Sequence, residues 1–208
     1  EKPLEGIITT AGVGENYKNN QMVSAIDKLG SASFWDPQKT SVRLNRKMDD
    51  YIKNLRLLLE RSNSIMFIDP HLDPTRPQYR NFIKIIELIC ERKCMPLIEI
   101  HRICYFGSGR SRVTIANKEW EKRFNSLFSP ICIKAGLKIK VFIWDNFHNR
   151  YLISDLMGIL LTNGFDESKK TVEETEWGRL SRKNRDDIQR EFDTASHQHA
   201  LIDSFSLP

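Results

Sequence analysis

His148, Arg150 and Asp155 have the types and the spacing of residues that could attack a phosphodiester. Side chains two positions apart on a strand point to the same face, so we expect the histidine and the arginine to lie together. We expect Asp155, at the end of the same strand, to turn back toward them. In such a set the imidazole is the nucleophile, the cation holds the phosphate oxygens, and the carboxylate orients the ring. The alternative is that all three are ordinary polar residues of a turn between strands.

Three extended segments are expected around this set. Residues 138–144 alternate charged and apolar side chains and then become fully apolar, and 150–154 and 158–162 read as two further short strands. The connection 155–158 is short enough for a hairpin turn and ends in a glycine, which can adopt a positive φ. The sequence therefore predicts that a strand hairpin carries the candidate residues.

Strand and helix patterns alternate upstream of this hairpin. Apolar residues recur at helical spacing, or follow one another as in a buried strand, over several segments. The predicted helices are 40–62, 78–92, 117–136 and, after the hairpin, 181–192, and the predicted upstream strands are 64–68 and 95–105. Because strand–helix–strand connections make strands parallel with helices on the sheet faces, the sequence predicts an α/β fold.

Polar residues follow the first upstream strand directly. Asp69, His71 and Asp73 come after 64–68, and ligands in open α/β sheets gather at the carboxyl ends of strands. They could therefore line the site, although a proline-fixed turn with local caps is the stronger interpretation.

His101 and Arg102 lie late in the second upstream strand, near the same edge of the sheet. A histidine on a strand is more often a hydrogen-bonded core residue than a catalyst, but its position makes His101 the best candidate in this chain for a second histidine of the site. Arg102 is a candidate for phosphate binding together with Arg110 and Arg112 of the glycine-containing loop that follows. Glycines let backbone amides approach a phosphate, and arginines bind it through several nitrogens. A plain flexible loop is the alternative for that segment.

The motif of His148, Arg150 and Asp155 resembles His-x-Lys-x4-Asp of the phospholipase D superfamily. Arginine stands in place of the usual lysine; it keeps the charge and can bind phosphate in a bidentate way, but it cannot be deprotonated. Asn163, followed by a glycine, loosely matches the polar residues after the family motif, out of register, and is assigned to phosphate binding. Glu176 lies at the distance where small nucleases of the superfamily carry a supporting glutamate.

The resemblance implies a phospholipase D-like α/β/α sandwich with a mixed, mainly parallel central sheet. It also implies a metal-independent nuclease without a cofactor, in which one histidine forms a phosphohistidine and another protonates the leaving oxygen. Because only one motif is present, the second histidine would be His148 of the other subunit of a homodimer, or His101 of the same chain as a less favoured arrangement. The alternatives are a catalytically inactive module that binds phosphoinositide-bearing, anionic membranes, and a scaffold domain that assembles with other protein subunits.

Composition limits the remaining possibilities. The chain has 208 residues and a formal net charge of +5, which permits an anionic partner such as nucleic acid. Its four cysteines have no zinc-finger spacing, so we expect reduced thiols, no metal site and a cytoplasmic protein. We predict an irregular N-terminal arm over 1–40, a phospholipase D-like domain over 41–193 and a C-terminal tail over 194–208.

Overall fold

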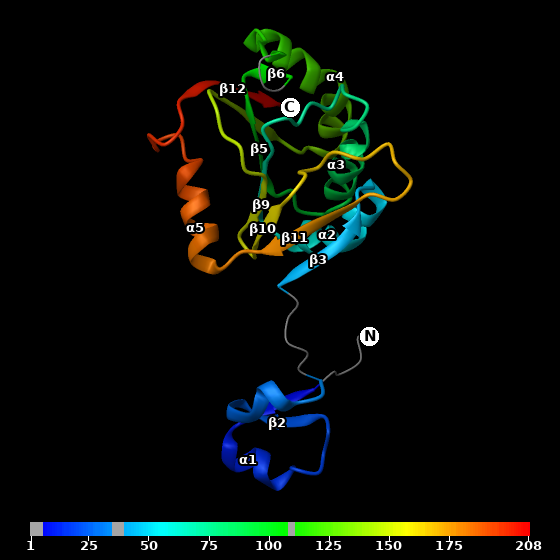
Figure 1. Ribbon diagram of the computed structural model, residues 1–208, viewed down its shortest axis with the longest axis vertical. Helices are drawn as coiled ribbons and strands as arrows, with labels where there is room; N and C mark the ends of the chain where they lie inside the picture. Colours follow the sequence, from blue (N-terminus) through cyan, green and yellow to red (C-terminus); the bar gives the residue numbers. More distant parts are fainter. Residues whose placement is uncertain (1–5, 35–39, 108–110) are drawn as a thin grey trace. The chain divides into compact units, whose positions relative to one another are not determined.

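The computed structural model describes residues 6–34, 40–107 and 111–208. The chain divides into two compact units, Glu1–Thr40 and Ser41–Pro208, which are considered separately below. Figure 1 shows the elements of both.

The smaller unit contains little regular structure. β1 (Ile7–Thr9) and β2 (Val23–Ala25) pair in parallel, with α1 (Ala11–Asn16) between them and a short 3₁₀ helix, η1 (Ile26–Ser31), after them. Among its described residues, Ala25 is the one buried hydrophobic side chain. Tertiary packing supplies most of the stability of short elements, so this unit has little of its own.

The larger unit is built on an eight-stranded sheet with the order β12-β8-β5-β4-β9-β10-β11-β3. Only the neighbouring strands β4, β5 and β8 are parallel, and every other pairing in this sheet is antiparallel. The strands are β3 (Ser41–Asn45), β4 (Ser64–Ile68), β5 (Leu97–Ile103), β8 (Ile139–Trp144), β9 (Tyr151–Ser154), β10 (Gly158–Leu161), β11 (Glu174–Arg179) and β12 (Leu201–Leu207). The sheet is mixed, as predicted, but its parallel part is smaller than predicted.

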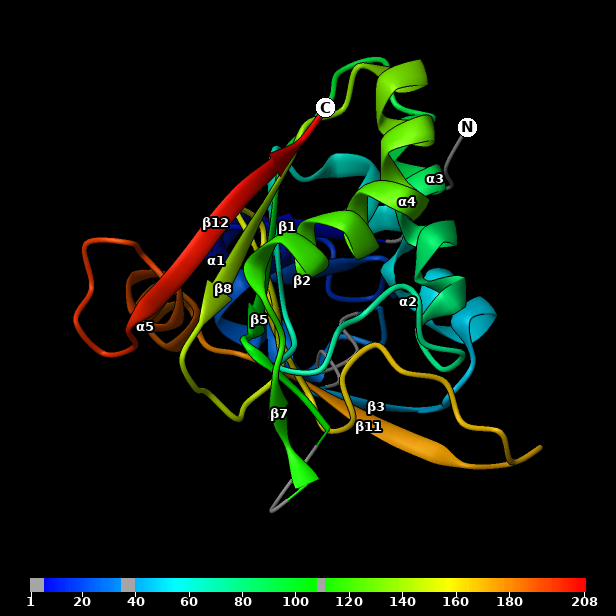
Figure 2. The ribbon, with the colours of Figure 1, turned by 90° about the horizontal axis from the view of Figure 1, so that it is seen from above.

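Helices cover both faces of this sheet. α2 (Met48–Arg61), α3 (Ile83–Cys90) and α4 (Asn117–Ala135) lie on one face, and α5 (Arg182–Glu191) lies on the other, as the two views in Figures 1 and 2 show. A 3₁₀ turn, η2 (Arg80–Phe82), leads into α3. A small separate hairpin, β6 (Tyr105–Phe106) with β7 (Val113–Thr114), follows β5. The unit is therefore an α/β/α sandwich.

Two hydrophobic cores hold these layers together. The larger one joins α2, α3 and α4 to the sheet through buried side chains such as Leu55, Phe82 and Phe128. The smaller one joins α5 to the other face through Phe142, Trp144 and others. The apolar stripes at helical spacing explain the large core, and Gly136, with φ 69°, ends α4 as the sequence predicts.

Three segments differ from the sequence predictions. Residues 41–45, part of a predicted helix, form edge strand β3, and β11 forms where no strand was predicted. The predicted tail is wrong for Leu201–Leu207, which form β12 and pair with β8 along its whole length. Each of these strands lies at or next to an edge of the sheet and pairs with a strand distant in sequence, a contact that local periodicity does not reveal.

Candidate active site

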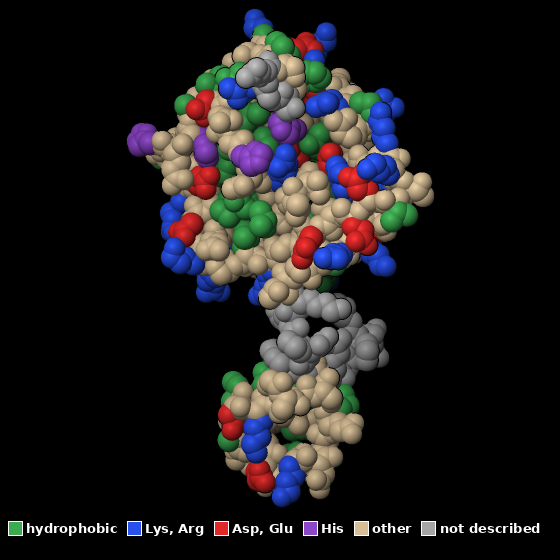
Figure 3. Space-filling view, in the orientation of Figure 1, with side chains coloured by type: hydrophobic (Ala, Val, Ile, Leu, Met, Phe, Trp, Pro, Cys, Tyr) green, Lys and Arg blue, Asp and Glu red, His purple; other side chains and the backbone are tan. Residues whose placement is uncertain are grey.

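The candidate site lies at the carboxyl ends of the three parallel strands. The loop that contains His71 follows β4, the β6–β7 hairpin follows β5, and the loop that contains His148 follows β8. These strands are neighbours in the sheet, so the three connections emerge side by side. On the face of the larger unit seen in Figure 3, histidine side chains gather with Lys and Arg side chains directly beside them.

Arg150 is fixed at this edge by a buried carboxylate. Its Nε lies 3.9 Å from Oδ1 of Asp69, and its Nη1 donates to the backbone oxygen of His148 over 3.3 Å. The Arg150 side chain is 19% exposed, whereas Asp69 is fully buried. A carboxylate behind a partly exposed guanidinium orients it and leaves its outer nitrogens for an anion.

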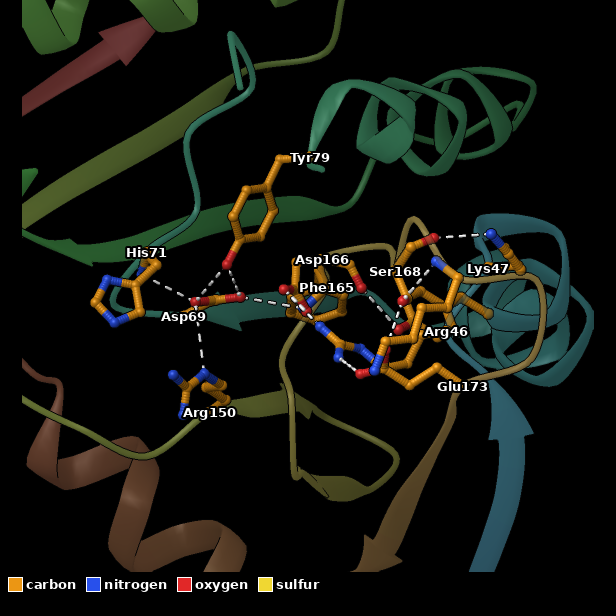
Figure 4. A network of polar contacts seen from close by, with 12 residues as sticks. Arg46, Lys47, Asp69, His71, Tyr79, Arg150, Phe165, Asp166, Ser168 and Glu173 are labelled. Atoms are coloured by element: carbon orange, nitrogen blue, oxygen red, sulfur yellow. Dashed lines mark hydrogen bonds and ion pairs between the residues drawn. The ribbon is translucent and has the colours of Figure 1, made fainter. Parts of the chain in front are cut away.

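Asp69 connects the separate loops of the site (Figure 4). Its Oδ1 accepts a hydrogen bond from the backbone nitrogen of His71 over 2.9 Å, and its Oδ2 accepts one from the backbone nitrogen of Phe165 over 3.1 Å. The Tyr79 hydroxyl donates to Oδ2 over 3.2 Å. Burial raises the pKa of Asp69, while these donors and the charge of Arg150 act to lower it. The carboxylate thus organises the loop after β4 and the loop after β10.

Gly164 allows this arrangement. Its φ is +76°, a region that side chains other than glycine rarely adopt. A Cβ at this position would lie 2.2 Å from Oδ2 of Asp69 and 2.9 Å from Cδ of Arg150. The glycine after Asn163, which the sequence analysis matched loosely to the family pattern, therefore gives room for the Asp69–Arg150 contact.

His71 lies in a strongly cationic environment. Burial, together with the smaller effects of the charges of Arg150, Arg102, Arg76 and His148, lowers its pKa to about 4. The ring is therefore neutral at neutral pH. An anion that entered this group of cations would be stabilised by them and would raise the pKa of His71.

The rings of His71 and His148 are both free to act on a ligand. Among the described residues, neither ring has a hydrogen-bond partner, and His148 is exposed. The structure thus brings together His71, His148 and Arg150, two histidines and a cation from one chain. From the sequence, His71 was predicted only to line the site; its position directly after a buried strand was the available signal.

A second polar network fixes the loop that follows Phe165 (Figure 4). Arg46 forms ion pairs with Asp166, at 2.7 Å, and with Glu173. Met48 and Asn81 each donate to the carboxylate of Glu167. This loop supplies the Phe165 nitrogen to Asp69, so these residues support the site without facing it. They could not be predicted from the sequence because their partners are 86 or more positions apart.

His101 is not part of this site. It is fully buried on the face covered by α5, where Trp144 Nε1 donates to its Nδ1 over 3.1 Å and Glu99 lies 3.3 Å from its Nε2. Its ring stacks on Phe142, and burial lowers its pKa. The hydrogen-bonded core role is therefore confirmed, and the candidate role of His101 as the second histidine is wrong, because both nitrogens have partners and no face is open.

Arg102 is also not available to a phosphate. It is 1% exposed, and it donates to the backbone oxygens of Ile103, Leu72 and Tyr105 over 2.8, 3.1 and 2.9 Å. Its guanidinium carbon lies 3.2 Å from the centroid of the Trp120 ring. Burial lowers its pKa to about 9, so it remains charged at neutral pH. Arg102, which was predicted to bind phosphate, instead holds the segments around the site together through these hydrogen bonds.

Asp155 does not orient His148. It follows the end of β9 whereas His148 precedes its start, and its carboxylate accepts hydrogen bonds from the backbone nitrogens of Asn63 and Ser64. Burial acts to raise its pKa, but the hydrogen bonds together outweigh this effect and lower it. The expectation that Asp155 turns back toward the histidine is wrong, and Asp155 instead joins the β9–β10 turn to the start of β4.

The remaining predicted residues have separate positions. Asn163 is half-buried next to Gly164, and Glu176 is exposed on β11 opposite Arg43, with its backbone oxygen bound by Thr162. Arg112 is exposed, with its guanidinium carbon 4.4 Å from the centroid of the Tyr105 ring. Arg110 lies outside the described residues.

Asp73, the other acidic residue considered after β4, is buried and caps its own turn. Its Oδ1 accepts from the nitrogen and the hydroxyl of Thr75, and its Oδ2 accepts from Arg123 over 2.8 Å. The interpretation as a capped turn is confirmed for this residue. In the described part of the chain, no three His, Cys, Asp or Glu side chains are grouped to hold a metal ion, and no helix is long and apolar enough to cross a membrane.

Comparisons with known proteins give only distant likenesses. No protein-family model matches the chain, and no curated protein matches its sequence. Three solved structures are similar in fold, at 10–12% sequence identity. The structure of TrmBL2, an archaeal chromatin protein with a described mode of DNA binding, matches 92% of this chain with a TM-score of 0.42. The polyphosphate kinase of Porphyromonas gingivalis matches 73% with a TM-score of 0.46, and the phosphatidylserine synthase of Haemophilus influenzae matches 78% with a TM-score of 0.44.

The chain spans 63%, 25% and 39% of the lengths of these three proteins, respectively. The chain itself has an α/β architecture with a mixed eight-stranded sheet. These likenesses concern the fold and carry nothing about activity.

Proposed function

We propose that this chain is a phospholipase D-like phosphodiesterase that acts on nucleic acid through His71 and His148, with Arg150 holding the phosphate. The observation that carries the proposal is the group of two unbonded histidine rings and one oriented guanidinium at the carboxyl edge of the sheet. A polar site with free imidazoles suits phosphoryl transfer through a histidine.

The lowered pKa of His71 assigns the roles. A neutral imidazole is a nucleophile, so a nitrogen of His71 forms a bond to phosphorus while the bond from phosphorus to the leaving oxygen breaks. His148, when protonated, gives its proton to that oxygen. Water then attacks the phosphohistidine, His148 takes a proton from the water, and the phosphorus–nitrogen bond breaks. Arg150 stabilises the charge on the non-bridging oxygens in both steps.

Under this proposal, a homodimer is not needed to complete the active site. Because one chain supplies both histidines, each site is complete without His148 of another subunit. The homodimer itself remains a prediction. Under the two-subunit arrangement, His71→Ala would retain activity, whereas the arrangement within one chain predicts that it does not.

The test is cleavage of labelled DNA and RNA by the full chain in EDTA. We expect cleavage by the unaltered protein and a loss of at least about a thousand-fold in both His71→Ala and His148→Ala. His197→Ala changes an exposed histidine of the loop before β12 and is the matched control, with unchanged activity. Cleavage that persists in either site variant, or no cleavage by the unaltered protein at high concentration, would overturn the proposal. In the second case, binding of phosphoinositide vesicles would be measured next.

A further inference from the structure

The β6–β7 hairpin leaves the sheet inside the candidate site. It follows β5, and β5 lies between β8 and β4 in the sheet. The hairpin therefore emerges between the loop that contains His148 and the loop that contains His71. Its described residues carry aromatic side chains, Tyr105 and Phe106, and an arginine precedes its second strand.

Two arginines lie against these rings. The guanidinium carbon of Arg76, from the loop after β4, is 4.9 Å from the centroid of Phe106, and that of Arg112 is 4.4 Å from the centroid of Tyr105. Contact with a ring restricts a long side chain, so less freedom remains to be lost when it binds a phosphate. Arg76 also lies close enough to His71 to affect its titration, so the cluster is continuous with the site.

These two arginines differ from the neighbouring Arg123, whose charge is balanced by carboxylates. Arg123 also approaches Phe106, but it is bound to the carboxylates of Asp73 and Glu119. Among the described residues, neither Arg76 nor Arg112 forms an ion pair. Their charge is therefore available to an anion.

Apolar surface is exposed beside them. Phe106 is 36% exposed and Val113, its partner across the hairpin, is 60% exposed. Surfaces that bind single-stranded nucleic acids combine cations that follow the backbone with aromatic faces on which bases stack. A duplex offers such a surface only its phosphates, because its bases are already stacked on one another.

We propose that Arg76, Tyr105, Phe106 and Arg112 form a binding surface for single-stranded nucleic acid next to the two histidines. The inference rests on the proposed function, because it names the substrate of that site. A base stacks on the exposed part of Phe106, and the two arginines bind the phosphates on either side of the one at Arg150. A free phosphate or a mononucleotide can use only part of this surface.

The experiment measures binding rather than cleavage, so that the two proposals can fail separately. In a His148→Ala background, anisotropy of a labelled single strand of about 12 nucleotides is followed at several salt concentrations, beside the matching duplex and a mononucleotide. We expect Phe106→Ala to weaken single-strand binding by about ten-fold. We expect Arg76→Ala and Arg112→Ala each to reduce the slope of log affinity against log salt by about 0.7.

Controls separate this surface from general effects. Arg61→Ala removes an exposed arginine at the end of α2, near the amino end of β4 and therefore at the opposite end of the strands from the site. It should change the affinity and the salt slope less than Arg76→Ala or Arg112→Ala does. Phe106→Leu keeps an apolar side chain without a ring, so it should fold normally and still bind weakly. Arg76→Lys keeps the charge and should retain the salt slope.

Several results would overturn the inference. One is that the variants bind the single strand as tightly as the parent does. The others are that the duplex binds as tightly as the single strand or more tightly, and that no oligonucleotide binds. Cleavage in EDTA by the unaltered chain together with unaffected binding in the variants would remove the surface and keep the phosphodiesterase. Impaired binding in the variants without any cleavage would keep the surface and remove the phosphodiesterase.

Discussion

The carboxyl edge of the sheet and the face covered by α5 each contain a histidine whose pKa burial lowers, yet the two regions use it differently. His101, under α5, has partners on both nitrogens and an aromatic ring stacked on it. His71, at the carboxyl edge, has cations around it, and its ring has no hydrogen-bond partner in the described part of the chain. The partners of an imidazole, more than its place near the end of a strand, decide whether it can act on a ligand.

Arg102 and Arg150 differ in the same way. Arg102 has its nitrogens on three backbone oxygens and is inaccessible, whereas Arg150 rests on one carboxylate and is partly exposed. Both were predicted to bind phosphate, because in the sequence both are cations near a strand end. Only Arg102, which is inaccessible, contributes mainly to stability. We therefore expect substitution of the buried residues, His101 and Arg102, mainly to lower stability. Substitution of His71 and Arg150 should mainly lower activity.

The largest effect on stability is expected for Arg102→Met. It leaves the backbone oxygens of Leu72, Ile103 and Tyr105 without their donor in a buried place, which should lower the free energy of unfolding by about 3–5 kcal/mol. Arg150→Met should cost only about 1–2 kcal/mol but abolish phosphate binding. Urea denaturation of both variants checks this. Similar losses of stability would show that the two arginines do not differ as described.

Gly164→Ala should cost about 2–3 kcal/mol. The substitution combines a positive φ with an overlap against Asp69 and Arg150, so Arg150 must move. Thermal unfolding and phosphate binding are the measurements. Gly136→Ala is the control, because it also has a positive φ but meets no atom within 4 Å. Equal effects of the two on phosphate binding would argue against a role for Gly164 in placing Arg150.

His101→Leu should cost about 2 kcal/mol because the buried Nε1 of Trp144 loses its acceptor. His71→Leu should change stability by less than about 0.5 kcal/mol at neutral pH while removing activity. Chemical denaturation and cleavage are measured on both variants. The comparison between the two regions would fail if His101→Leu kept full stability but lost activity through the site.

The smallest effect is expected for Asp155→Asn, at about 1 kcal/mol near neutral pH. Donors from Asn63 and Ser64 lower the pKa of Asp155 in the folded chain, so its contribution is present above the unfolded value and is lost as pH falls through the folded value. Stability measured from pH 7 to pH 2 should therefore converge for the variant and the parent at the acid end. Cleavage should be retained, in contrast to the role first predicted for this residue.

The sequence was sufficient for the elements with strong local patterns. The buried strand Ser64–Ile68, the stripe of α4 and the β9–β10 hairpin follow from periodicity and turn residues. It was not sufficient for β3 and β12, whose pairing depends on distant partners. The same limit applies to the site: a strand pattern indicates which residues are near an edge, but not which nitrogens find a backbone oxygen there.

The most direct test of the central claim is a titration of the histidine rings by NMR, with and without inorganic phosphate. We expect the His71 ring to titrate near pH 4 in the free chain and at a higher pH when phosphate is bound, because the anion offsets the charges of Arg150 and its neighbours. His101, with both nitrogens bonded, should show no response to phosphate. A His71 that titrates near 6.5 and is unchanged by phosphate would contradict the account.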